Sequence, residues 1–140
     1  MSIQALLLPL FVQVALTFAL GFWFAGMRVK SIRSGETRQR DVALREPNWP
    51  PRVTQIGNAF HSQLEMPVLF YVVIIVSWMT KTADILFVAL AWIYVILRLV
   101  HAYIHVTDNR MRPRGMVFIT SCIVLCVMWI IVAVRVLAVV

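Results

Sequence analysis

Four apolar stretches, each long enough to cross a bilayer, restrict what this chain can fold into. They occupy residues 3–27, 59–80, 85–106 and 116–140, and a membrane-spanning helix needs about 20 mostly apolar residues. Hydrophobic residues make up 61% of the chain and its mean hydropathy is +0.86, whereas soluble domains are roughly half apolar. The sequence predicts an all-α protein: a four-helix transmembrane bundle that forms a single domain over residues 1–140.

Basic residues gather in two of the predicted loops. Seven of the 13 lysines and arginines lie in residues 28–57, three lie in 107–115, and the turn between the second and third helices has only Lys81. The positive-inside rule then predicts that both basic loops are cytoplasmic and that both termini face the opposite side of the membrane. This topology explains the net charge of +7 without nucleic acid, and it favours contact with anionic lipid or an anionic ligand.

The 28–57 loop is long for a small bundle, and long loops often act as lids or binding loops. Because Pro47, Pro50 and Pro51 disfavour a regular helix, we expect either such a loop or a solvated connector at the headgroups. Pro67 should kink the second helix. The short "MTKTAD" turn predicts that the second and third helices are antiparallel neighbours.

Ionisable side chains form a stripe along each of these two helices. The third helix carries Tyr94, Arg98, His101 and His105, which are four, three and four residues apart. The second helix carries Asn58, His61 and Glu65, which are three and four residues apart. Each set shares one helical face, and such faces should turn away from lipid. They indicate either an ion pair between Glu65 and Arg98 that fixes helix register, or a binding or catalytic site near the cytoplasmic side.

Two ligand classes fit these side chains. Three imidazoles and Glu65 would suit zinc or iron, but Arg98 on the same face would repel a cation, and we predict no metal. An anionic ligand fits better, because Arg98, Arg112 and Arg114 can clamp carboxylates. Nearby arginines would also stabilise a thiolate. Cys122 and Cys126 are not placed for this role, so the thiol would arrive with a ligand.

Two strings carry a resemblance to a known family. These are "NAFHSQLEMPVLFY" on the second helix and "RLVHAYIHVTDNRMRPRGMVF" from the third helix into the next loop. With four helices and a long basic first loop, the whole chain resembles the MAPEG family, the membrane-associated proteins in eicosanoid and glutathione metabolism. The patterns E-x-P-x-L-F-Y and R-x-x-H-x-x-x-H-V-T-x-N are most similar to its bacterial branch.

The resemblance implies a homotrimer that binds glutathione in clefts between subunits. Arg114 matches the arginine thought to stabilise the glutathione thiolate and is the candidate catalytic residue. The candidate glutathione-binding residues are Asn58, Glu65, Arg98, His101, His105 and Arg112. The implied function is a membrane-bound transferase or peroxidase acting on lipophilic electrophiles held by apolar walls. The alternative is a non-catalytic accessory or scaffold subunit of a larger membrane complex.

The sequence also departs from the family's pattern. The usual arginine beside the asparagine is replaced by Gly57, and Asn58 stands seven residues before Glu65 instead of three. Ser62 occupies the expected asparagine position. Gly115 and Phe118 stand where a serine or tyrosine often follows the thiolate arginine.

Overall fold

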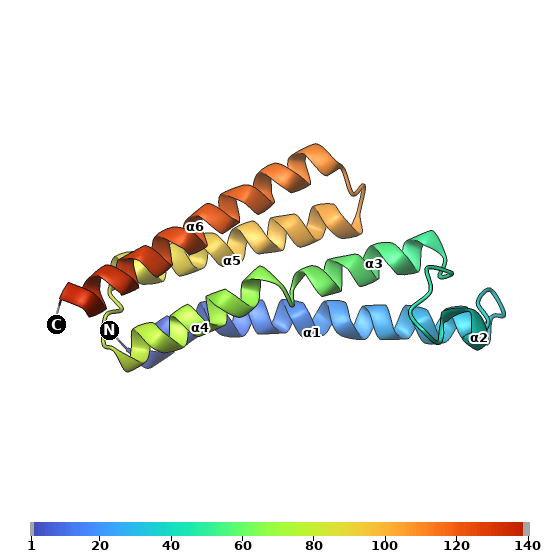
Figure 1. Ribbon diagram of the computed structural model, residues 1–140, viewed down its shortest axis with the longest axis horizontal. Helices are drawn as coiled ribbons and strands as arrows, with labels where there is room; N and C mark the ends of the chain where they lie inside the picture. The colour runs from blue at the N-terminus through green and yellow to red at the C-terminus, as the bar shows by residue number, and fades with distance from the viewer. Residues whose placement is uncertain (1, 139–140) are drawn as a thin grey trace.

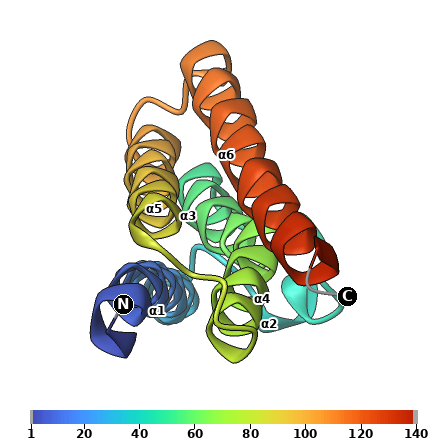
Figure 2. The same ribbon diagram turned by 90° about the vertical axis from the view of Figure 1, so that its left-hand side faces the viewer.

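A computed structural model describes residues 2–138 as an elongated bundle of helices (Figure 1). In chain order these are α1 (Ile3–Arg33), α2 (Gln39–Val42), α3 (Pro51–Ser62), α4 (Met66–Met79), α5 (Ile85–Val106) and α6 (Met111–Ala138). The α5–α6 pair lies above α1 and α4 when the bundle is viewed along its length (Figure 2). The start of α1 and the end of α6 lie at the end of the bundle that carries the 80–84 turn, and α2 lies at the opposite, basic end (Figure 1).

The predicted four-helix transmembrane bundle is confirmed. The described residues contain four helical spans long and apolar enough to cross a membrane: Ile3–Arg33, Pro51–Met79, Ile85–Val106 and Met111–Ala138. Outward-facing side chains are largely apolar, including Phe11, Phe18 and Phe22 on α1, as expected where lipid replaces water as the solvent. The core instead joins α4, α5 and α6 and includes Leu6 of α1, with the Phe70 and Tyr94 ring centroids 4.6 Å apart in a stacked arrangement.

Helix ends differ from the predicted bounds where proline was taken as a breaker. The second span begins at Pro51, well before residue 59, because proline fits the first turn of a helix, where its missing N–H has no partner to lose. The last span likewise begins at Met111 and holds Pro113 in its first turn. The first span continues to Arg33, and the third matches 85–106. Residues 139–140 of the predicted fourth helix lie outside the described residues.

Pro67 has the predicted effect, in a stronger form than a kink. The second span breaks between Ser62 and Met66, because the proline ring cannot share space with the carbonyl of residue 63 in a continuous helix. At the break the Gln63 N–H turns to the Phe60 carbonyl, and the Gln63 side-chain amide donates to the Ala59 carbonyl at 3.2 Å. Gln13 of α1 in turn donates to the Gln63 amide oxygen at 2.8 Å, so side-chain hydrogen bonds stabilise the break.

Asp84 fixes the opposite end of the bundle. Its carboxylate accepts hydrogen bonds from the Phe87 N–H at 2.9 Å, which caps α5, and from the Arg135 guanidinium of α6 at 2.7 Å. Arg135 also donates to the Thr82 carbonyl at 2.6 Å. The Arg135 hydrogen bond, followed by the Phe87 one, lowers the pKa of Asp84 below its ordinary value of 3.8.

Acid should therefore weaken the bundle through Asp84. A lowered pKa means that the charged carboxylate stabilises the fold fully above about pH 4, and that this contribution is lost as pH falls through the folded-state pKa. Asp84→Asn keeps a capping oxygen but no charge. We expect the wild type to have the higher melting temperature in detergent near neutral pH. The difference in unfolding free energy should be less than about 1 kcal/mol, because the Asp84–Arg135 pair is partly exposed. The difference should shrink as pH falls below about 4, and a constant difference would contradict this role.

Candidate functional site

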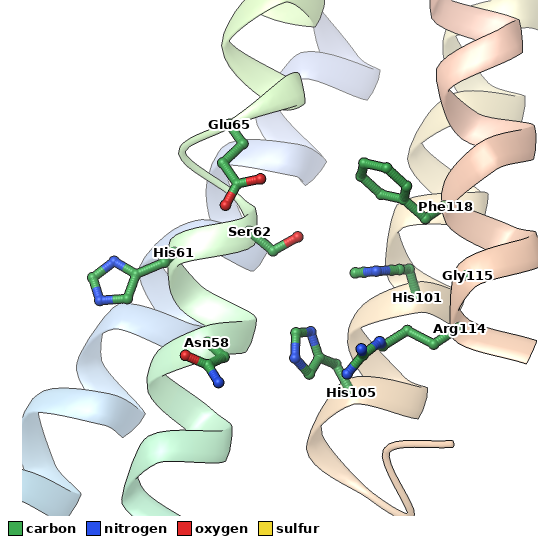
Figure 3. A pocket seen from close by; sticks show the side chains of 9 residues that line it. All are labelled: Asn58, His61, Ser62, Glu65, His101, His105, Arg114, Gly115 and Phe118. Atoms are coloured by element: carbon green, nitrogen blue, oxygen red, sulfur yellow. The ribbon is translucent and has the colours of Figure 1, made fainter. Parts of the chain in front are cut away.

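A cleft opens between α3 and the α5–α6 pair toward the basic end of the bundle. Its volume is about 410 Å³, within the range of roughly 300–1,000 Å³ typical of small-molecule sites. Side chains from three helices and from the α3–α4 break surround it (Figure 3). The lining residues are Asn58, His61, Ser62, Glu65, His101, His105, Arg114, Gly115 and Phe118.

Two histidines form the α5 wall. His101 and His105 stand one helical turn apart with ring centroids 5.5 Å from each other, and the His101 ring lies 5.8 Å from that of Phe118. Both side chains are buried, and neither Nδ1 atom has a hydrogen-bond partner among the described residues. The wall thus presents buried polar atoms that a ligand can satisfy.

Arg98 lies behind this wall, one turn deeper in the membrane. It is fully buried, and its Nη2 donates to the Ser62 hydroxyl at 2.8 Å and to the Ser62 carbonyl at 3.1 Å. Its Nε and Nη1 atoms have no partner among the described residues. An ion pair with Glu65, one of the two alternatives that the sequence left open, does not form, since within residues 2–138 Glu65 takes part in no ion pair. The break before Met66 places the Ser62 carbonyl, rather than the carboxylate, against the guanidinium.

Arg114 enters the cleft from the first turn of α6. Its guanidinium donates to the side-chain oxygen of Asn109 and points toward His105 (Figure 3). Asn109 follows the end of α5 with a positive φ of 53°, a conformation that asparagine tolerates better than most residues. The loop residue therefore orients the arginine across the mouth of the cleft.

The α3 wall is fastened to the end of α5. The Gln55 amide donates to the carbonyls of His105 and Thr107, each at 2.9 Å, and Arg52 donates to the Val106 carbonyl at 2.5 Å. These carbonyls belong to the last turn of α5 or follow it, where no helical partner is available. The two side chains therefore cap α5 and set the width of the cleft.

Comparison with known families decides the assignment. The MAPEG family model matches residues 6–134, nearly the whole chain. The chain belongs to the MAPEG family. This confirms the resemblance drawn from the two sequence strings, and it makes the chain an integral membrane protein of the family associated with glutathione and eicosanoid metabolism. No curated protein and no solved structure matches the chain.

The structure brings together most of the predicted site of this MAPEG chain. Lining the cleft are Asn58, Glu65, His101, His105 and Arg114. Arg98 reaches it only through Ser62 and through the Phe118 ring, whose centroid lies 5.9 Å from the guanidinium carbon. Arg112 is exposed and lies outside the lining. His61 lines the edge, with its ring turned away from the histidine pair (Figure 3).

Three residues that position or enclose the predicted side chains were absent from the predicted set. Ser62 positions Arg98, Asn109 positions Arg114, and Phe118 closes the wall beside His101. A signal existed for Ser62, which lies three residues before Glu65 and takes the family's asparagine position. Asn109 had a signal too, because asparagine is favoured just after a helix end. Phe118 had none, since one more aromatic residue in an apolar helix is unremarkable in sequence.

The charges around the cleft favour an anion. Arg114 and Arg98 contribute two positive charges, and Glu65 is the single carboxylate in the lining. Asn58 and Ser62 are neutral donors, and the histidines add further polar atoms. A ligand with carboxylates and one ammonium group would match this set of partners.

Proposed function

We propose that this MAPEG chain binds glutathione in the α3–α5–α6 cleft and conjugates it through its sulfur to lipophilic electrophiles or uses it to reduce lipophilic peroxides. The observation that carries the proposal is an open cleft lined by Arg114, with Arg98 buried directly behind its wall and carrying two donor atoms that no group of residues 2–138 accepts from. Glutathione has two carboxylates, an ammonium and a thiol, so Arg98 and Glu65 can hold its charged ends. Arg114 at the mouth then faces the sulfur.

The chemistry requires a thiolate. A guanidinium beside the sulfur favours the charged form, so the thiol releases its proton to solvent near neutral pH. With an electrophile, the sulfur forms a bond to carbon and the leaving group departs with its electron pair. With a peroxide, sulfur attacks the terminal oxygen and the O–O bond breaks to give an alcohol and a sulfenic acid. A second glutathione reduces that acid to water and a disulfide.

The proposed assembly and orientation follow the same reasoning. We propose a homotrimer in a bacterial inner membrane, with the 28–57 and 107–115 segments on the cytoplasmic side, where glutathione is available. The cleft lies at the basic end of the bundle, as this orientation requires. Apolar surfaces of neighbouring subunits would hold the second substrate.

Calorimetric titration of the detergent-purified protein with glutathione tests the proposal. We expect a saturating heat below millimolar concentration for the wild type. Arg112→Ala should leave the titration unchanged, because Arg112 is exposed and outside the cleft although it shares the R-P-R string with Arg114. Absence of heat up to millimolar glutathione would contradict the proposal and favour the non-catalytic alternative, a scaffold in which Arg98 serves only to join α3 and α5.

A further inference from the structure

A separate pocket lies at the basic end of the bundle, between the last turns of α1 and the start of α3. Its volume is about 370 Å³, and it shares no lining residue with the glutathione cleft. Trp23, Met27 and Val53 form its apolar wall, whereas Lys30, Arg52 and Glu36 supply charge. Lys30 lies seven residues beyond Trp23 on one helix, which separates them by about 10 Å along its axis. The pocket is therefore apolar toward the membrane and charged toward the headgroups.

The charged groups in this pocket form no ion pairs with one another. The ion pairs of residues 2–138 are Arg40–Asp41, Arg110–Asp108 and Arg135–Asp84, so Lys30, Glu36 and Arg52 take part in none. Arg52 uses Nη1 for Gln55 and Val106, while its guanidinium lies 5.4 Å from the Trp23 ring. Two cations and one anion thus share a pocket without neutralising each other.

We propose that this pocket binds a phospholipid whose headgroup carries both a phosphate and a primary ammonium, of the phosphatidylethanolamine type. Lys30 and Arg52 match the phosphate, since basic pockets between transmembrane helices bind lipid phosphates. Glu36 matches the ammonium, which a purely anionic headgroup lacks. Trp23 and Met27 lie at the depth of the glycerol and upper acyl chains, where tryptophan commonly marks the membrane interface. The apolar wall favours a lipid over a soluble phosphate ester.

Native mass spectrometry of the full chain tests this lipid site. The delipidated protein is mixed with equal amounts of phosphatidylethanolamine, phosphatidylcholine and phosphatidylglycerol that carry identical acyl chains. We expect the ethanolamine lipid to be retained most. Lys30→Gln should lower its retention on the order of fivefold, the effect of about one interfacial cation. Glu36→Gln should remove its advantage over phosphatidylglycerol, because the pocket then lacks the ammonium partner.

Matched controls make the outcome decisive. Arg33→Gln removes one positive charge from the same helix end, but Arg33 is exposed and does not line the pocket, so retention should not change. Unaltered melting temperature and gel-filtration volume confirm that each variant is folded. Equal retention of the three lipids, or an Arg33→Gln effect as large as that of Lys30→Gln, would overturn the proposal. Displacement of the lipid by soluble glycerophosphoethanolamine at equal concentration would overturn the choice of a lipid over a soluble ester.

Discussion

Replacing Arg114 by alanine is expected to lower kcat for glutathione conjugation by a factor of about 10² to 10³, the usual effect of removing one group that stabilises a reacting anion. The affinity for glutathione should change much less, because Arg98 and the α3 residues remain. The variant's rate should also rise with pH through the ordinary range of a free thiol near 8.5, since its bound glutathione must ionise unaided. Stopped-flow conjugation of an activated aryl halide, combined with the ultraviolet absorbance of the bound thiolate, measures both effects.

Arg112→Ala is the matched control for that experiment. It removes the same side chain two residues away, from a position that is exposed and outside the cleft. An Arg114→Ala enzyme that forms thiolate and product as fast as the wild type would show that another group activates the sulfur. Equal losses in the two variants would show that only the general positive charge of the loop matters.

Replacing Arg98 by methionine is expected to weaken glutathione binding at least about thirtyfold, the lower end of the 2–5 kcal/mol that truncating a buried charged contact costs. The stability of the fold should not decrease. Arg98 is fully buried and its partner is neutral Ser62, so an apolar side chain of similar length removes the desolvation cost of a buried charge and leaves no carboxylate unpaired. Calorimetry with glutathione and thermal unfolding in detergent measure the two consequences separately.

Two further variants separate ligand binding from helix joining at Arg98. Arg98→Lys keeps the charge but loses the planar guanidinium, so its affinity should be intermediate. Ser62→Ala removes one of the two hydrogen bonds to Arg98 and should weaken glutathione binding less than Arg98→Met does. Wild-type affinity in Arg98→Met, accompanied by a lower melting temperature, would identify Arg98 as a purely structural residue.

The four membrane-spanning helices could be predicted from the sequence because lipid imposes a simple requirement. A helix in hydrocarbon must be apolar over about 20 residues, and the third span from Ile85 to Val106 matches its predicted bounds. The effect of Pro67 was equally predictable, since a proline within an apolar span removes a helical N–H and its ring clashes with the carbonyl four residues earlier. Pro51 was misleading because the effect of a proline depends on whether it stands within a helix or in its first turn.

The sequence by itself determined that Arg98, His101 and His105 share one face, because helical periodicity is local and needs no tertiary information. Only the tertiary structure decided what that face meets. The break at residues 63–65 replaced Glu65 by Ser62 as the partner of Arg98, and the turn at Asn109 brought Arg114 into the cleft while Arg112 stayed exposed. Such choices depend on the relative rotation of packed helices. A rotation of one residue, about 100° on a helix, exchanges one side chain for another without altering any local preference.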